Sequence, residues 1–331
     1  ISSSVALAAL ALTISASVAA VTTRSFVLDS ADAFFKGELE GTAVRSDGAI
    51  LPGAATERVP LDNVPIAYSM ARRGSTIFIG TGTNGTVYRV NGKKVEELAT
   101  TGELVVSSLA FGRDGALYAG TLPNGRIYRI EPKSGTTKRF ATPEGAKHIW
   151  ALHYDKARGQ LIAATGPEGK LFTVDSVGRA KELYDADASH IMALTGDKKG
   201  NLFAGTSDAA LLIRIARDGT ARVLHDFPGN EVTAIDVHEG RIAAAANQFK
   251  TAPATNFKPT ANKSRQPATR PRPGTGQVWR IDPDGRAEML LARKDTHFTA
   301  VQWGPKGSIY AGGGHQGRVF EVQPDASYAI W

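Results

Sequence analysis

The sequence predicts an all-β fold, a β-propeller, and three observations support it. A hairpin unit recurs along the chain, and its clearest copy covers residues 117–130. In that copy, alternating side chains flank an Asn-Gly turn, which is typical of two antiparallel strands. The position of Gly120 recurs as Gly or Ala at 80, 120, 164, 205, 245 and 312. A near-constant period of about 40 residues, with strand patterns and no helical ones, is typical of propeller blades.

Each full copy of the repeat predicts four strands, which is the standard propeller blade. Inner strands begin near residues 64, 105, 148, 190, 231 and 297, and each is followed by the hairpin and a polar outer strand. Residues 40–51 match the beginning of a blade, but Pro52-Gly53 replaces a clean second strand. We therefore expect seven blades, six full ones and a shortened N-terminal one. The alternative is a six-bladed propeller with residues 24–62 wrapped around its outside.

The first 20 residues form an uncharged run of small and apolar side chains that ends in Ser17-Val18-Ala19-Ala20. Such a run is typical of the core and cleavage region of a secretory signal peptide. We interpret residues 1–23 as a signal peptide and residues 24–331 as the propeller domain. The alternative is a retained N-terminal anchor, because the run has the length that spans a bilayer. Either interpretation predicts a periplasmic, secreted or cell-surface protein.

The composition excludes several kinds of chemistry. The chain has no cysteine, so it forms no disulfide, no thiolate nucleophile and no Cys-ligated zinc site. Nucleophile-elbow, P-loop and HExxH patterns are absent from the sequence. Residues 80–85 and 312–317 both spell GxGxxG, but a strand pattern follows each of them. A dinucleotide site needs a helix after the glycines, so these segments are predicted to be hairpin turns.

The net charge of +7 comes largely from residues 249–275, a Pro-rich segment between the second and third strands of one blade. This insertion has no acidic residue, and its six basic residues are Lys250, Lys258, Lys263, Arg265, Arg270 and Arg272. Five prolines and little apolar content predict a loop without a core. Its basic residues predict contact with an anionic lipid surface or an acidic polysaccharide. Export disfavours nucleic acid as the partner, and a solvated loop is the alternative.

One column of the repeat carries candidate site residues. The first residue of each inner strand is, in order along the chain, Glu40, Val64, Val105, His148, His190, Glu231 and His297. Equivalent positions on successive blades form a ring around the propeller axis. We therefore predict a ligand-binding site at one mouth of the channel, formed by His148, His190, Glu231 and His297. Imidazoles and a carboxylate also suit a divalent metal such as Zn²⁺. The alternative is a set of solvated channel residues.

Two further sets of residues are predicted to be structural. Trp150 and the other aromatic residues on strand positions are expected to pack between blades. Four arginines share one column of the third strands, where we expect them to pair with acids of neighbouring blades or to line a surface; they are Arg89, Arg129, Arg214 and Arg280.

The repeat Val-Ser-Ser-Leu-Ala-Phe-Gly-Arg-Asp-Gly-Ala-Leu-Tyr-Ala-Gly-Thr (106–121) resembles exported bacterial β-propellers of the WD40-like, YVTN-like and NHL-like kind. It is also similar to the propeller repeats of two-component sensors. The lead-in at residues 34–48 resembles uncharacterised secreted propeller proteins. The Gly-His and Trp-Asp dipeptides of true WD40 repeats do not recur, and the His-rich column differs from the acids and Asn of lactonase propellers. The resemblance therefore implies the fold and a binding role.

We expect a non-catalytic, exported scaffold that binds a protein, a glycan or a small ligand on one face. Rigid blades with variable loops suit such a role. The alternative is an enzyme, a metal-dependent hydrolase or lyase with its ion in the central channel.

Overall fold

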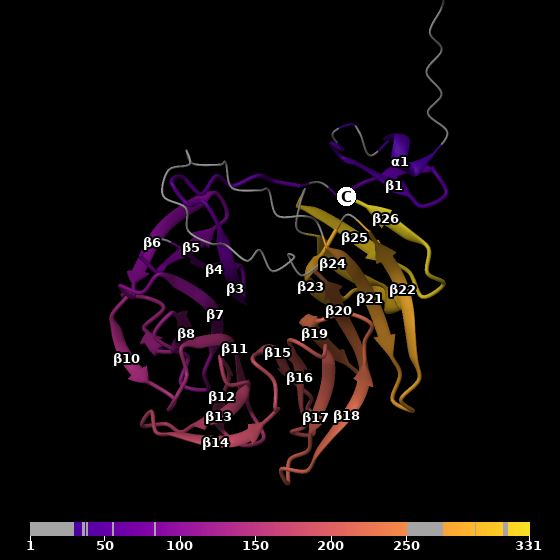
Figure 1. The fold of residues 1–331 in the computed structure, drawn as a ribbon. Helices are drawn as coiled ribbons and strands as arrows, with labels where there is room; N and C mark the ends of the chain where they lie inside the picture. The colour runs from indigo at the N-terminus through magenta and orange to yellow at the C-terminus, as the bar shows by residue number, and fades with distance from the viewer. Residues whose placement is uncertain are drawn as a thin grey trace, which may run out of the picture.

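The computed structural model describes residues 30–34, 37, 39–54, 56–82, 84–249, 274–294, 296–313 and 317–331. It is a β-propeller of six blades around a central opening (Figure 1). The predicted signal peptide and the six basic residues of the insertion lie outside the described residues. None of the helices in the described part of the chain combines the length and apolar character that crossing a bilayer requires.

Blades 1 to 3 are three separate four-stranded antiparallel sheets. Blade 1 contains β3 (Ala67–Arg73), β4 (Thr76–Thr81), β5 (Thr86–Asn91) and β6 (Lys94–Thr100). Blade 2 contains β7 (Val105–Phe111), β8 (Leu117–Leu122), β9 (Ile127–Ile130) and β10 (Thr137–Ala141). Blade 3 contains β11 (His148–Asp155), β12 (Gln160–Gly166), β13 (Lys170–Val174) and β14 (Ala180–Asp185).

Blades 4 and 5 repeat the same arrangement, and blade 6 is extended at its outer edge. Blade 4 contains β15 (Ile191–Gly196), β16 (Leu202–Thr206), β17 (Leu211–Ile215) and β18 (Ala221–Asp226). Blade 5 contains β19 (Glu231–His238), β20 (Arg241–Gln248), β21 (Thr275–Ile281) and β22 (Ala287–Arg293). Blade 6 contains β23 (Phe298–Trp303), the 3₁₀ turn η1 (Pro305–Gly307), β24 (Ile309–Gly313), β25 (Arg318–Val322) and β26 (Tyr328–Ile330).

The prediction of a seventh, shortened blade is wrong, and the six-bladed alternative is confirmed. The segment that resembles a blade forms two short strands, β1 (Thr42–Arg45) and β2 (Ile50–Pro52). β1 pairs antiparallel with β26, so both strands extend blade 6 outward and make it a six-stranded sheet. The short helix α1 (Ala31–Phe34) precedes them and packs on the core between blades 5 and 6 (Figure 1).

Every inner strand has a β-bulge at the same place, where its register against the second strand shifts by one residue. A bulge re-aims a side chain, and in several blades the bulged residue reaches the following blade. Ser107 Oγ–H donates to the carbonyl of Ile149, and Thr233 Oγ1–H donates to the carbonyl of Phe298 at 2.6 Å. The bulge is therefore a repeated device that joins one blade to the next.

The apolar core lies between the blades as five separate clusters. They fill the interfaces between blades 1 and 2, 2 and 3, 3 and 4, 4 and 5, and 5 and 6. Within the described residues, no such cluster joins blade 6 to blade 1.

The arginine column is structural, but its side-chain partners, acids for three arginines and the Asn201 amide oxygen for Arg214, belong to the same blade. Arg89 pairs with Glu96 at 2.8 Å, and Arg129 pairs with Asp114 at 2.9 Å. Only Arg89 also reaches forward, where it donates to backbone carbonyls of blade 2. The expected pairing with acids of neighbouring blades is therefore wrong, because the adjacent strands of one sheet place the acids closer.

Candidate functional site

The predicted column does lie at one mouth of the propeller, because all inner strands run in the same direction around the axis. The strand registers define the equivalent residues as Ile66, Val105, His148, His190, Glu231 and His297. In blade 1 the position belongs to Ile66, two residues after the expected Val64, because β3 begins only at Ala67. Glu40 lies beside β1 at the outer edge of blade 6, outside the ring.

His148, Trp150 and His190 form a compact group at this mouth, which we call the mouth cluster. The rings of His148 and His190 are 5.6 Å apart between centroids, and each lies 5.2–5.4 Å from the Trp150 ring. Trp150 occupies the bulge of β11, so its ring leaves the strand toward blade 4. The cluster thus joins blade 3 to blade 4 with two imidazoles and one indole.

Hydrogen bonds hold His190 in one orientation. Trp150 Nε1–H donates to His190 Nδ1 at 3.1 Å, so the neutral imidazole carries its proton on Nε2. The backbone of His190 is held as well, because its N–H donates to Ser207 Oγ at 3.0 Å and its carbonyl accepts from Ser207 N–H at 2.9 Å. Nε2 of His190 is therefore the ring nitrogen left for a ligand.

Both imidazoles of the mouth cluster favour the neutral form. Burial lowers the pKa of His148, and the nearby His190 and Lys147 lower it further. Burial also lowers the pKa of His190, against the opposing charge of Asp208. Nδ1 of His148 is buried and has no hydrogen-bond partner within the described structure. This nitrogen is shielded from solvent, so a ligand bonds to it only after the His148 ring turns.

The other two predicted residues lie on the same ring but do not complete the cluster. Glu231 pairs its backbone with Asn247 and bridges to Ser207, and burial raises the pKa of its carboxyl group. The ring of His297 lies 5.5 Å from that of Phe249. Blades 3 and 4 therefore supply the imidazole pair, and blades 5 and 6 continue the same rim.

The described residues include no group of three or more His, Asp or Glu side chains that could hold a metal ion. His148 and His190 could supply two nitrogen ligands. A zinc site takes at least three protein ligands, so a metal here would need a donor beyond this pair.

Gly166 allows the mouth cluster to form. A Cβ at this residue would lie 2.0 Å from His190 Nδ1 and 2.8 Å from Trp150 Nε1. Any side chain would therefore displace the hydrogen bond between the two rings. Gly166 ends β12 directly opposite His148, its antiparallel partner.

A cavity of about 310 Å³ lies on the propeller axis among all six inner strands. Trp150 lines this cavity and also belongs to the mouth cluster, whereas His148 and His190 are not among the lining residues. Apolar residues line most of the cavity, for example Leu152, Leu194 and Ile235. Polar atoms make up slightly more than half of its exposed lining, so the cavity offers hydrogen-bonding groups beside apolar side chains.

The basic insertion leaves and rejoins the propeller at this same mouth. Its two ends continue β20 and β21, where Gln248 pairs with Thr275. Asn230 fixes the outgoing end, because its side chain accepts from Phe249 N–H at 3.1 Å and donates to the Phe249 carbonyl at 3.2 Å.

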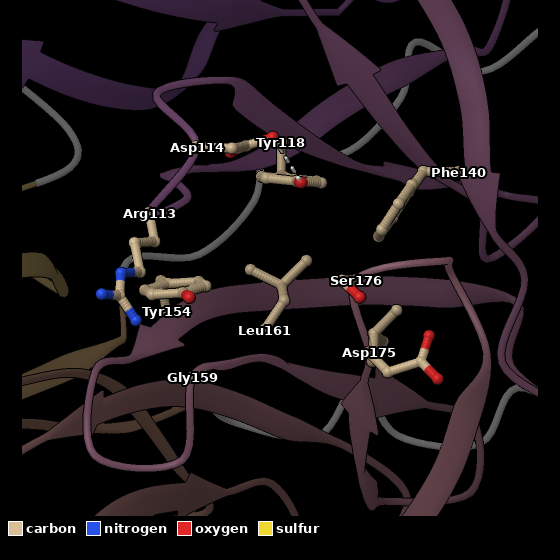
Figure 2. Close-up of a pocket in the computed structure, with 10 residues that line it drawn as sticks. Arg113, Asp114, Tyr118, Phe140, Tyr154, Gly159, Leu161, Asp175 and Ser176 are labelled. Carbon is tan, nitrogen blue, oxygen red and sulfur yellow. Dashed lines mark hydrogen bonds between the residues drawn. The ribbon is translucent and has the colours of Figure 1, made fainter.

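A second cavity, of about 460 Å³, lies between blades 2 and 3 (Figure 2). Its walls include Tyr118, Phe140 and Tyr154, and Arg113 lies at its edge. The carboxylates are already engaged: Asp114 accepts from Arg129 and Tyr118, and Asp175 accepts from Arg179 and two backbone amides. The mouth cluster, with its unpaired nitrogen, is therefore the stronger candidate site.

Sequence analysis missed Trp150 as a site residue, because strand alternation assigned it to the core between blades. The bulge after Ile149 changes the direction of its side chain, and no residue type marks that bulge in the sequence. The signal in the sequence was that side chains of different kinds occupy this position in successive inner strands, which is unusual for a buried core position.

No family model and no curated protein sequence matches this chain. Its fold is similar to hydrazine synthase of Kuenenia stuttgartiensis, with a TM-score of 0.62, 17% identity and coverage of 81% of this chain and 80% of that chain. Virginiamycin B lyase of Staphylococcus aureus gives a TM-score of 0.59, 11% identity and coverage of 87% and 86%. A structure of a nidogen/laminin complex gives 0.53, 13% identity and coverage of 74% and 87%. The resemblance to β-propeller proteins is thus confirmed for the fold.

Proposed function

We propose that this protein is an exported β-propeller that acts as a binding scaffold without chemistry of its own. Its ligand-binding site is the mouth cluster together with the axial cavity beneath it. Export through residues 1–23 is part of the same proposal, and it predicts that the protein is recovered from the periplasm, medium or cell surface. The partner that we propose is a protein or glycan that presents a small polar group to this mouth.

The imidazole pair at the mouth, with His190 oriented by Trp150 and its ring 5.6 Å from that of His148, is the observation that carries the proposal. Both rings favour the neutral form, so the site suits an uncharged polar group better than a strong anion. Trp150 adds an aromatic surface to a cavity whose lining is about equally polar and apolar. Aromatic rings with polar edges are frequent at binding sites because they combine apolar area with a hydrogen bond.

A ligand-observed NMR screen of monosaccharides, short peptides and neutral fragments would test this site. The parent protein is compared with the double variant His148→Ala/His190→Ala and with His238→Ala. His238 is exposed and ends β19, at the opposite end of an inner strand, so it is a matched control. We expect compounds that bind the parent and the control but not the double variant. If every bound compound binds the double variant equally, the mouth cluster is not the site.

A second candidate function is a metal-dependent hydrolase or lyase with its ion at the mouth. The imidazole pair favours it, and proteins named as lyases share the fold. One of those structures is a catalytically inactive variant with quinupristin. The test is turnover of ester, lactone and peptide reporters with added Zn²⁺ or Mg²⁺. Metal-dependent turnover that the double variant lacks would establish this candidate in place of the scaffold.

A further inference from the structure

Blade 6 and blade 1 present two apolar sheet faces that do not pack on each other. The inner strands of successive blades contact one another from β3 through to β23, but β23 and β3 form no comparable contact among the described residues. Figure 1 shows these two strands farther apart than any other neighbouring pair around the central opening. We call the space between the facing sheets of blades 6 and 1 the blade slot.

Blade 6 exposes an apolar residue toward the slot at a position that is buried in each of the other five blades. One residue of each third strand pairs with the Gly120 column and points to the following blade. In blades 1 to 5 these residues are fully buried: Val87, Ile127, Leu171, Leu212 and Val278. The equivalent residue of blade 6, Val319, is 40% exposed. Val319 is apolar like its five equivalents, but no sheet of the described structure covers it.

The glycine column shows the same difference. A Cβ at Gly80, Gly120 or Gly205 would lie 2.5–2.7 Å from an apolar side chain of the following blade's inner strand. A Cβ at Gly312 would meet only Ala300 of its own blade, at 3.5 Å. Gly312 therefore has the shape that admits a further inner strand, and no strand of the described chain occupies it.

The face of blade 1 toward the slot matches this exposure. The residue that packs backward on the preceding blade is buried in blades 2 to 6, where it is Val106, Ile149, Ile191, Val232 or Phe298. In blade 1 it is Ala67, which is exposed. Met70, on the same strand, is exposed as well, at 69%. Two exposed apolar faces of this kind mark an interaction surface.

We propose that the blade slot binds a β-sheet of another polypeptide as a seventh blade supplied in trans. The two faces are the same rows of the repeat that form the five established blade interfaces, so the slot continues that set of interfaces. A sheet that packs between two other sheets must carry apolar side chains on both of its faces, as the blades of this propeller do. The partner is therefore a compact antiparallel sheet with apolar side chains on both faces.

The two long segments outside the described residues do not have the sequence length of a blade. Residues 1–29 and 250–273 are both shorter than the repeat of about 40 residues that builds a blade, and the second carries five prolines. A second copy of the chain presents the same two faces and no spare blade. A sheet supplied by a partner polypeptide fits both faces at once. This proposal concerns a surface distinct from the mouth cluster.

The test uses the blade 2 sequence as the probe, because blade 2 packs between two sheets. Its Leu117 and Ala119 belong to the core with blade 1, and its Tyr118 and Ile127 belong to the core with blade 3. A polypeptide of residues 101–141 is titrated into the full chain and followed by size-exclusion chromatography with light scattering. We expect a one-to-one complex. A lysine at Val319 places a charge on the slot face, so Val319→Lys should weaken binding by roughly tenfold or more.

Val223→Lys is the matched control, because Val223 is an exposed valine on the outer strand of blade 4. A second arm avoids dependence on the solubility of the free probe: residues 101–141 are appended after Trp331 of the full chain. We expect this fusion to unfold at a higher temperature than the parent. Val319→Lys should remove that gain, whereas Val223→Lys should preserve it.

Three results would overturn the proposal. One is a fusion with no gain in unfolding temperature and a free probe that does not bind. Another is binding that Val319→Lys leaves unchanged. The third is a parent chain that dimerises by itself and becomes monomeric with Val319→Lys, because the occupant would then be a second copy. None of these results affects the mouth cluster, so failure of the slot and failure of the proposed ligand site are distinguishable.

Discussion

Trp150 Nε1–H donates to His190 Nδ1 across the boundary between blades 3 and 4, at 3.1 Å. The bond fixes which nitrogen of His190 carries the proton and orients the imidazole toward the channel mouth. It depends on the bulge in β11, which aims Trp150, and on Gly166, which leaves room for both rings. The binding properties of the mouth therefore follow from backbone features as much as from the histidines.

Replacing Trp150 with Phe should change the tautomer of His190. The variant keeps an aromatic ring but loses the donor, so a proton on Nδ1 becomes possible. We expect a loss of about 1 kcal/mol in the free energy of unfolding. The ¹⁵N spectrum of the labelled imidazoles should show a new Nδ1–H population. Trp279→Phe is the control, because Trp279 donates to Gln277 within blade 5 and should leave the His190 signals unchanged.

Replacing Gly120 and Gly312, two equivalent glycines, with alanine should change the free energy of unfolding by different amounts. At Gly120 the added Cβ would lie 2.4 Å from Ser108 Oγ and 2.5 Å from Ile149 Cγ2, so Gly120→Ala should cost about 1–3 kcal/mol. At Gly312 it meets Ala300 at an ordinary distance, so Gly312→Ala should be neutral or slightly stabilising. Urea denaturation of both variants measures the difference. An equal loss at both positions would mean that blade 1 packs directly on blade 6.

Asn247 joins blade 5 to blade 6 from a fully buried position. Its side chain accepts from Phe298 N–H at 2.8 Å and donates to the Phe298 carbonyl at 2.9 Å. Asn247→Ala leaves the buried Phe298 amide unpaired, so we expect a loss of about 2 kcal/mol in unfolding free energy. Gln248→Ala, at the exposed next residue of the same strand, should change stability little. Similar losses for both variants would contradict a specific role of Asn247.

The buried carboxyl group of Glu231 should make stability depend on pH. Burial raises its pKa in the folded protein above the ordinary value of a glutamate, so the folded state holds the proton more tightly than the unfolded state. This contribution is fully present below about pH 4.5 and is lost as pH rises through the folded pKa. Glu231→Gln should therefore gain stability relative to the parent between pH 4 and pH 8. Glu239→Gln, at an exposed turn, should follow the parent at every pH.

The basic insertion should bind polyanions in a salt-dependent way. Deleting residues 251–272 removes five of its six basic residues, so binding to heparin and to vesicles rich in phosphatidylglycerol should weaken, with a flatter dependence on salt. A variant with all six basic residues changed to Gln keeps the length of the segment and should lose binding equally. Unchanged binding by both variants would contradict polyanion contact.

The fold could be predicted because each copy of the repeat marks the positions of its own strands and turns. Turn residues and the Gly120 column recur with each blade, and the same residues close the hairpins of the structure. The count of blades failed at residues 40–51, whose strand and turn pattern matches a blade opening. Instead, β1 pairs with the outer edge of the three-residue strand β26, and β2 pairs with β1. Pairing between segments about 285 residues apart leaves no local mark in the sequence.

The candidate site could be predicted in part. The column that holds His148 and His190 follows from the repeat, and the structure brings these two together. The place of Trp150 could not be predicted, because a bulge reverses which face its side chain takes. The exposure of Val319 could not be predicted either, since its sequence context matches that of five fully buried residues.

The central claim is that the mouth binds its ligand through neutral imidazoles and without a metal ion. Metal analysis of the parent, purified without chelator or added metal, tests it beside the His148→Ala/His190→Ala variant. Two nitrogen ligands are too few for a tight zinc site, so we expect no stoichiometric metal in either protein. About one equivalent of zinc or a similar ion in the parent, absent from the double variant, would contradict the claim and favour the hydrolase or lyase.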